Sequence, residues 1–345
     1  MDLSKISLAK STYIIPIGVC TVLILAIIFT CFFTHLSACD ETKYVYVDND
    51  DNVDSVFNKV DEIACPIGIT GFRTLMRYSN YAEHVRTGRY EINPGDATFT
   101  VFRRIKNGQQ TPLNLTIPEV RTVERLAAEL SKKLMVDSLS LLSALEDEAV
   151  CRKYGRNTAT IISMFIPNTY EMFWNISAEK LMERMDKESK NFWNSDRKAK
   201  AKALNMSETE VITLASIIDE ETANNGEKPM VAGMYYNRLQ QGMPLQADPT
   251  VKFARKDFAA RRVYRDWLTT DSPYNTYKNA GLPPGPIRIP SIAGIDAVLN
   301  LVHHDYLYMC AKEDFSGTHN FAVTYAEHQQ NARRYSAALN ARGIK

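Results

Sequence analysis

An apolar stretch near the amino terminus constrains the fold of this chain most strongly. No charged side chain occurs between Lys10 and His35, and Tyr13–Phe33 is almost continuously apolar. In a helix, the 21 residues from 13 to 33 span about 31 Å, which matches the hydrocarbon thickness of a bilayer. The sequence therefore predicts a single membrane-spanning helix at residues 13–34.

The charges on either side of this stretch predict its orientation. Lys5 and Lys10 precede it, whereas the residues that follow are acidic: Asp40, Glu41, Asp48, Asp50 and Asp51. Because positively charged flanks stay on the cytoplasmic side, we expect a cytoplasmic tail at residues 1–12. Residues 35–43 are then a linker, and the remainder of the chain lies outside the membrane.

The segment Leu36-Ser37-Ala38-Cys39 allows a second interpretation of the amino terminus. It looks like the motif at which bacterial lipoproteins are cleaved and then lipidated on the cysteine. The apolar run is longer than the apolar core of a signal peptide, and His35 lies directly before the motif. Both features favour an uncleaved anchor. In either case the rest of the chain is tethered outside.

Length and composition indicate a globular protein of two domains and exclude some classes of function. The chain has 345 residues, more than one hydrophobic core of ordinary size requires. Its 41 Lys and Arg residues balance 40 Asp and Glu residues, which argues against a nucleic-acid partner and suits a neutral, polar substrate. The six cysteines form no CxxC pair, so neither a disulfide framework nor a zinc site is expected.

Hydrophobic periodicity predicts an α+β fold with two differently built parts. Residues 44–120 show strands near 44–47, 88–92 and 113–117 and helices near 53–64, 72–85 and 98–106. Residues 121–345 are mainly helical. We therefore expect a small α/β domain followed by a larger, mainly helical α+β domain.

One helix of the larger domain carries a candidate catalytic acid. Ser207-Glu-Thr-Glu210 is a capping box that predicts a helix beginning at about Glu208. At 100° per residue, Glu221 falls between Leu214 and Ile217 on the apolar side, while Glu220 falls on the side expected to face solvent.

Apolar surroundings raise the pKa of a carboxylic acid, which is the property that a general acid for glycosidic cleavage requires. Because Gly226 is close to the end of this helix, the alternative is that Glu221 lies in a frayed last turn.

Polar and aromatic residues are concentrated in loops after this helix. The segments are Tyr236-Asn-Arg-Leu239, Leu245-Gln-Ala-Asp-Pro-Thr250, Ser272-Pro-Tyr-Asn-Thr-Tyr277 and Gly281-Leu-Pro-Pro-Gly-Pro-Ile287. Rigid loops of this composition supply the stacking surfaces and hydrogen bonds with which proteins bind sugars. Each segment alone is also ordinary turn material.

In this order the motifs resemble the MltG-type (YceG-like) endolytic murein transglycosylases over nearly the whole chain. The most specific block is Leu214-Ala-Ser-Ile-Ile-Asp-Glu-Glu-Thr222. The other blocks are Phe165-Ile-Pro-Asn-Thr-Tyr170, the loop segments above, Gly317-Thr-His319-x-Phe321 and Glu327-His328. The resemblance implies a LysM-like domain at 44–120 and a catalytic transglycosylase domain at 121–345. Asp219 replaces the Glu that relatives often have, and Ile166 precedes Pro167 where they often have Trp or Phe.

The resemblance further implies a reaction and a set of site residues. The reaction is lytic cleavage between N-acetylmuramic acid and N-acetylglucosamine of nascent glycan strands, which leaves 1,6-anhydro ends, with Glu221 as general acid and base. The implied substrate-binding residues are Tyr236, Asn237, Arg238, Gln246, Asp248, Tyr274, Asn275 and His319. Gln246 and Asn275 are expected to orient the sugar, and Tyr236 and Tyr274 to stack on it. Asp248 supports a neighbouring residue or forms a turn.

The expected partners are peptidoglycan, the bacterial inner membrane and peptidoglycan synthases. No cofactor or metal is expected, because the spacing of His303, His304, His319 and His328 matches no compact metal site. Two other functions stay open at this point. One is a non-catalytic scaffold that binds glycan through residues 44–120, and the other is a lysozyme-type hydrolase, which leaves free reducing ends.

Overall fold

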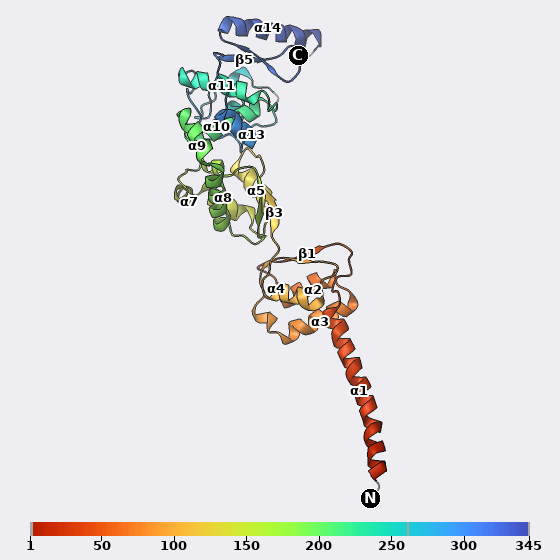
Figure 1. The fold of residues 1–345 in the computed structure, drawn as a ribbon. Coiled ribbons are helices and arrows are strands. Elements are labelled where there is room, and N and C mark those ends of the chain that lie inside the picture. The colour runs from red at the N-terminus through yellow and green to blue at the C-terminus, as the bar shows by residue number, and fades with distance from the viewer. Residues whose placement is uncertain (1–2, 261, 344–345) are drawn as a thin grey trace. The chain divides into compact units, whose positions relative to one another are not determined.

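The computed structural model describes residues 3–260 and 262–343, and the chain divides into two compact units (Figure 1). Unit 1 comprises Met1–Asn114 and Glu171–Ile176, and unit 2 comprises Leu115–Tyr170 and Ser177–Lys345. Helices and short two-stranded sheets alternate along the chain, which confirms the predicted α+β class. The LysM-like assignment of residues 44–120 stays a prediction.

Unit 1 begins with a long helix, α1 (Leu3–Phe33). Its segment Ile15–Phe33 has a mean hydropathy of 2.6, and none of it is buried against the rest of the protein. Among the described residues this is the one helix that is long and apolar enough to cross a membrane. Pro16 lies inside α1, near the start of the apolar segment, and helices that span membranes tolerate proline.

The globular part of unit 1 is a two-stranded sheet covered by helices. Strand β1 (Lys43–Val47) pairs antiparallel with β2 (Gly88–Ile92), and Val45 lies opposite Tyr90. Alternation along β1 directs Val45 and Val47 into the core and leaves Tyr44 and Tyr46 exposed. The helical elements of this unit are α2 (Val53–Asp61), α3 (Pro66–Tyr78), the 3₁₀ turn η1 (Tyr81–Glu83) and α4 (Thr98–Lys106).

Helix α3 begins six residues before the predicted start of 72, and it ends at Tyr78 rather than at 85. The residues at the start of the helix explain why it begins earlier than predicted. The thiol of Cys65 accepts the backbone N–H of Gly68, and Pro66 occupies the first turn, where its missing N–H costs nothing. The sequence prediction followed the apolar spacing and missed this cap.

The predicted linker at residues 35–43 is part of the fold of unit 1. Leu36 is fully buried, its N–H donates to Asp96 O (2.9 Å), and Cys65 N–H donates to Leu36 O (2.8 Å). Ala38 N–H donates to Ile63 O (2.8 Å). The chain therefore passes from α1 into the core of unit 1 without a free spacer.

A second stretch of chain, far along the sequence, completes unit 1. Strands β3 (Leu113–Thr116) and β4 (Thr169–Met172) form a two-stranded sheet, and the chain then continues through Glu171–Ile176 in unit 1. There the ring of Trp174 lies 5.0 Å from that of Tyr46, and Asn175 Nδ2 donates to Thr87 O (3.1 Å). No pattern in the sequence predicted that the chain returns to unit 1.

Unit 2 is mainly helical, as predicted. Its elements before the site are α5 (Val123–Ser131), α6 (Ser138–Glu146), α7 (Glu148–Lys153), the 3₁₀ turn η2 (Ile161–Met164), α8 (Ala178–Phe192) and α9 (Ser195–Ala203). Those that follow are α10 (Glu208–Glu221), α11 (Lys228–Gln240), α12 (Asp248–Arg255), the 3₁₀ turn η3 (Arg265–Thr269), α13 (Ile292–Leu299), β5 (Tyr308–Ala311), β6 (His319–Ala322) and α14 (Tyr325–Ala341).

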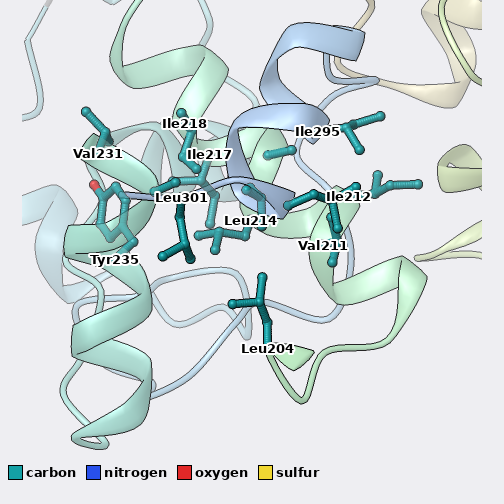
Figure 2. Packing of buried hydrophobic residues seen from close by; sticks show 14 of the residues in the cluster. Leu204, Val211, Ile212, Leu214, Ile217, Ile218, Val231, Tyr235, Ile295 and Leu301 are labelled. Carbon is teal, nitrogen blue, oxygen red and sulfur yellow. The ribbon is translucent and has the colours of Figure 1, made fainter. Parts of the chain in front are cut away.

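Helix α10 lies in the centre of unit 2. The predicted capping box is present, because the Ser207 hydroxyl accepts Glu210 N–H and the Glu210 carboxylate accepts Ser207 N–H. Every residue from Val211 to Ile218 is buried, and their side chains meet those of α11 and α13 in one hydrophobic cluster (Figure 2). A helix buried on all sides has no solvent-facing side, so the amphipathic wheel was too simple for α10.

A hairpin and a helix close the chain. Strands β5 and β6 pair antiparallel with Met309 opposite Phe321, and α14 packs against both strands. Thr324 and Glu327 form a capping box at the start of α14. The hairpin carries His319 at the first position of β6.

Candidate active site

Three consecutive carboxylates end α10, and each has a different environment. Asp219 forms a buried ion pair with Lys228 (Nζ to Oδ1, 2.8 Å) and accepts the backbone N–H of Ser291, the residue that caps α13. Gly294 allows this approach, because a Cβ atom there would lie 2.4 Å from Asp219 Oδ1. Asp219 therefore holds α10, α11 and α13 together.

Glu220 is bound by two arginines. Arg121 donates to both carboxylate oxygens, from Nε to Oε1 (2.9 Å) and from Nη2 to Oε2 (2.8 Å), and Arg288 Nη1 donates to Oε1 (3.1 Å). The Glu220 side chain is only 14% exposed. The prediction that Glu220 faces solvent is wrong, because segments distant in the sequence bring both arginines over this side of the helix.

Glu221 is the member of the three that has no cationic partner. The hydroxyl of Tyr235 donates to Glu221 Oε1 (2.7 Å), and no ion pair of Glu221 occurs among the described residues. Burial raises the pKa of Glu221 to about 7, against the opposing effect of the Tyr235 hydrogen bond. The charge of Asp248 raises this pKa further, whereas those of His319 and Lys252 lower it. The predicted position of Glu221 against packed surface is confirmed.

Tyr235 is the site residue that the sequence prediction missed. Its side chain is buried and lies beside Val231 at the edge of the hydrophobic cluster (Figure 2). The predicted residue, Tyr236, instead packs against the core and donates its hydroxyl to Leu204 O (3.3 Å). Successive residues of a helix point about 100° apart, so only the packing of α11 on α10 decides which tyrosine reaches Glu221.

Three predicted substrate-binding residues are part of the scaffold. Arg238 is 7% exposed and donates to three backbone carbonyls, those of Leu307, Pro244 and Leu245. Asn275 is fully buried, and its amide donates to Leu268 O and Thr270 O. Asn237 donates to His304 O (2.6 Å) and Tyr306 O (3.1 Å). Because these polar groups are already satisfied within the protein, we reassign them to holding the loops around the site.

Other predicted residues remain available to a ligand. Asp248 begins α12, is exposed, and accepts the hydroxyl of Tyr277 (2.6 Å). Gln246 is exposed and has a φ of +51°, a conformation that few residues other than glycine adopt. The ring of Tyr274 lies 4.8 Å from that of Phe253 and lines a cavity of about 160 Å³.

His319 is fixed by a buried carboxylate. Glu227 accepts the His319 backbone N–H (2.6 Å), and its Oε2 lies 2.9 Å from His319 Nδ1. Thr222, the residue after Glu221, donates its hydroxyl to the same Oε2 (3.1 Å). The imidazole is thus positioned through a network that begins next to Glu221.

A larger cavity lies on the Glu220 side of the helix end. Its volume is about 410 Å³, and it is lined by Glu119, Val120, Arg121, Thr122, Arg125, Glu220, Phe258 and Arg288. A narrow neighbouring cavity shares Arg121 and Glu220 with it and adds Lys252, whose charge also acts on Glu221. Glu221, a carboxylic acid of raised pKa, thus directly follows Glu220, which lies on the wall of a cavity whose size is typical of ligand sites.

The histidines and acidic residues of this region form no metal site. Within residues 3–260 and 262–343, no three His, Cys, Asp or Glu side chains are grouped so that they could hold a metal ion. We assign no metal ligand, and the expected absence of a cofactor stays a prediction.

The fold and site define a candidate acid–base enzyme, and Glu221 is its candidate proton donor. Comparison with known proteins identifies the family: residues 45–334 match the YceG-like family, and the chain belongs to it. The chain is 28% identical to the endolytic murein transglycosylase of Bacillus subtilis (strain 168) over 285 residues, which cover 78% of each protein.

Two further relatives agree. The endolytic murein transglycosylase of Streptococcus pneumoniae serotype 2 is 26% identical over 305 residues, which cover 78% of this chain and 54% of that protein. A crystal structure of a yceG-like protein from Listeria monocytogenes matches with a TM-score of 0.56 at 26% identity, over 85% of this chain and 99% of the other. The predicted family is confirmed, and so is the prediction that the chain is a transglycosylase enzyme.

Proposed function

We propose that the chain is an endolytic lytic transglycosylase of peptidoglycan, with Glu221 as its general acid and base. The bond cut lies between N-acetylmuramic acid and N-acetylglucosamine, and the product ends in 1,6-anhydro-N-acetylmuramic acid. The observation that carries this proposal is the pKa of about 7 at Glu221, in a helix end whose two other carboxylates are paired with cations. The named activity of the curated relatives supports the substrate class.

The raised pKa gives Glu221 the protonation state that the first step requires. At pH 7 about half of the molecules carry the proton on Glu221, whereas fewer than about 1% of ordinary glutamic acids do. Burial and the lack of a cationic partner disfavour the carboxylate. A general acid works best when its pKa is near the working pH.

The Tyr235 hydrogen bond assigns different roles to the two carboxyl oxygens. Oε1 accepts the tyrosine hydroxyl, so Oε2 is free to carry the proton toward the substrate. Glu221 donates this proton to the bridging oxygen while the bond from that oxygen to the muramyl C1 breaks through an oxocarbenium-like state. The hydrogen bond from Tyr235 then stabilises the carboxylate that is left.

The second step regenerates the acid. The Glu221 carboxylate removes the proton from the muramyl 6-hydroxyl, and the O6 electron pair forms a bond to C1. This closes the 1,6-anhydro ring and leaves Glu221 protonated, as it began. No water enters the products, so no second carboxylate is required as base or nucleophile.

The arginine-lined cavity and the exposed loop residues are the proposed substrate contacts. Glu220 holds Arg121 and Arg288 in fixed positions on the cavity wall, which reduces the entropy lost when they bind a polar ligand. Gln246, Asp248, Tyr274 and His319 are proposed to contact the glycan around Glu221. The α1 helix is proposed as the anchor that keeps both units on the outer side of a bacterial inner membrane, where peptidoglycan synthases would supply nascent strands.

One observation favours the hydrolase as a second candidate. Asp248 is close enough for its charge to raise the pKa of Glu221, and lysozyme-type hydrolysis uses a second carboxylate. In this structure Asp248 accepts the hydroxyl of Tyr277, and we propose that it supports the site rather than reacting.

Mass spectrometry of products from purified peptidoglycan separates these functions. We expect muramyl ends that are lighter by one water than hydrolytic ends, and at least a hundredfold loss of products in Glu221→Gln. Glu179→Gln, at an exposed position of α8, is the matched control and should cleave normally. Near-normal anhydro product from Glu221→Gln would exclude its role, and free reducing ends from the unmodified chain would indicate the hydrolase.

A further inference from the structure

We propose that unit 1 lies directly on the outer surface of the membrane and contacts lipid through a patch around the end of α1. This anchor-proximal patch consists of Phe33, Ile67 and Phe99. The proposal rests on α1 as a retained membrane anchor and is independent of the catalytic role of Glu221.

Helix α1 is joined to the globular part of unit 1 without a hinge. Thr98 N–H donates to Thr34 O (3.1 Å), and His35 pairs with Ala97 in an antiparallel bridge. A Cβ atom at Gly71 would lie 2.0 Å from Cys31 O, so α3 approaches the last turns of α1 at backbone contact. Because two other helices hold the end of α1, the direction of the anchor fixes the orientation of unit 1.

The same packing argues that the anchor is retained. Cleavage before Cys39 would remove Leu36, which is fully buried and accepts the N–H of Cys65 (2.8 Å). A missing buried leucine leaves an unfilled cavity, which destabilises the core. The core of unit 1 thus contains residues that cleavage before Cys39 would remove.

The length of the uncharged segment determines how deep the patch lies. The 24 residues from 11 to 34 carry no charge and span about 36 Å as a helix, against about 30 Å of hydrocarbon. Phe33 must therefore lie within about one helical turn of the outer boundary. The ring of Phe99 lies 6.0 Å from that of Phe33, which places α4 at the same depth.

The exposed side chains at this depth match a lipid interface. Phe33, Ile67 and Phe99 are 54%, 55% and 37% exposed, although all three are large and apolar. Ile67 precedes Gly71 by one turn of α3 and so lies on the face next to α1. Arg103 is exposed one turn after Phe99, with its guanidinium 5.9 Å from the ring centre, where it can meet a lipid phosphate.

Quenching by lipids with brominated acyl chains tests this contact on the full chain in nanodiscs. Phe99→Trp and Ile67→Trp add a reporter to the patch, and Tyr44→Trp adds one to the exposed face of β1 as a matched control. The signal of the three native tryptophans is subtracted by using the unmodified chain. We expect the added fluorescence in the patch to fall at least twofold, and that of the control to change little.

Two results would overturn the proposal. One is equal quenching of the tryptophans added at positions 67, 99 and 44, in variants whose near-ultraviolet circular dichroism is unchanged. If only one of the two patch variants meets this condition, its quenching is compared with that of Tyr44→Trp. The other comes from the unmodified chain: an intact mass that corresponds to a start at an acylated Cys39 would exclude the retained anchor. A mass that includes residues 1–38 is the result expected.

Discussion

The hydroxyl of Tyr235 donates a 2.7 Å hydrogen bond to Oε1 of Glu221, from a neighbouring helix of the same hydrophobic cluster. This bond stabilises the ionised form of Glu221, while burial of the carboxyl group destabilises it. The balance of the two effects leaves the pKa of Glu221 at about 7. An acid with this pKa can both give and take a proton at neutral pH, which the proposed reaction requires.

Tyr235→Phe tests this balance. Without the hydroxyl, the pKa of Glu221 should rise further, because the bond that stabilises the carboxylate is lost. Activity that needs protonated Glu221 should then decline at a higher pH than in the unmodified chain. At pH 7, kcat should fall about tenfold, because the carboxylate that forms in the first step loses its stabilising hydrogen bond. The pH profile of product formation measures the shift.

Tyr236→Phe is the matched control for this experiment. It removes a hydroxyl from the adjacent position of α11, but that hydroxyl donates to Leu204 O and not to Glu221. Its pH profile should coincide with that of the unmodified chain. If both variants shift the profile equally, the Tyr235 bond does not control the acid.

Glu221→Gln should also change stability in a pH-dependent way. The folded-state pKa of about 7 lies above the unfolded value, so protonation of Glu221 favours the folded state. That stabilisation is complete below about pH 4 and is lost as the pH rises through about 7. Relative to Glu221→Gln, the unmodified chain should therefore lose about 1–3 kcal/mol between pH 4 and pH 8.

Thermal unfolding of both chains at pH 4, 6 and 8 measures this difference. As the pH rises, the unfolding temperature of Glu221→Gln should increase relative to that of the unmodified chain. A constant difference over the whole range would show that Glu221 does not change its protonation in the folded protein.

Lys228→Ala should destabilise unit 2 strongly. Lys228 and Asp219 form an ion pair in which both side chains are buried, so removing the lysine leaves an uncompensated charge in the interior. The expected cost is about 3–5 kcal/mol in denaturant unfolding. The double variant Asp219→Asn with Lys228→Met should recover part of this loss, since Asn can still accept the N–H of Ser291. If the single and double variants were equally stable, the unpaired charge of Asp219 would not be the cause of the destabilisation.

Arg288→Gln tests the cavity beside Glu220. Arg288 links Glu220 to Glu119 and lines the cavity, while Arg121 still holds Glu220 after the change. If the cavity binds the glycan, KM should rise severalfold with a smaller change in kcat. Arg184→Gln, which breaks an ion pair on α8, serves as control and should leave both constants unchanged. A fall in kcat alone would place Arg288 in the chemical step instead.

Local sequence determined the parts of this protein that depend on neighbours within one or two helical turns. The uncharged stretch after Lys10 is long enough for a spanning helix, and Ser207 and Glu210 fix the start of α10 through a reciprocal cap. From that start, helical periodicity turned Glu221 toward packed surface. These interactions need no knowledge of the rest of the chain, so their spacing alone predicts them.

Tertiary packing decided the environment of each carboxylate. Arg121 and Arg288 reach Glu220 across 99 and 68 residues of sequence, and Tyr235 rather than Tyr236 faces Glu221 because of how α11 packs on α10. Packing also assigned Arg238 and Asn275 to the scaffold, where backbone carbonyls satisfy their donors. A buried polar group must find a partner, and which partner it finds depends on segments that meet only in the folded chain. Sequence periodicity orients a side chain on its helix, but the pKa of that side chain depends on what the fold brings to it.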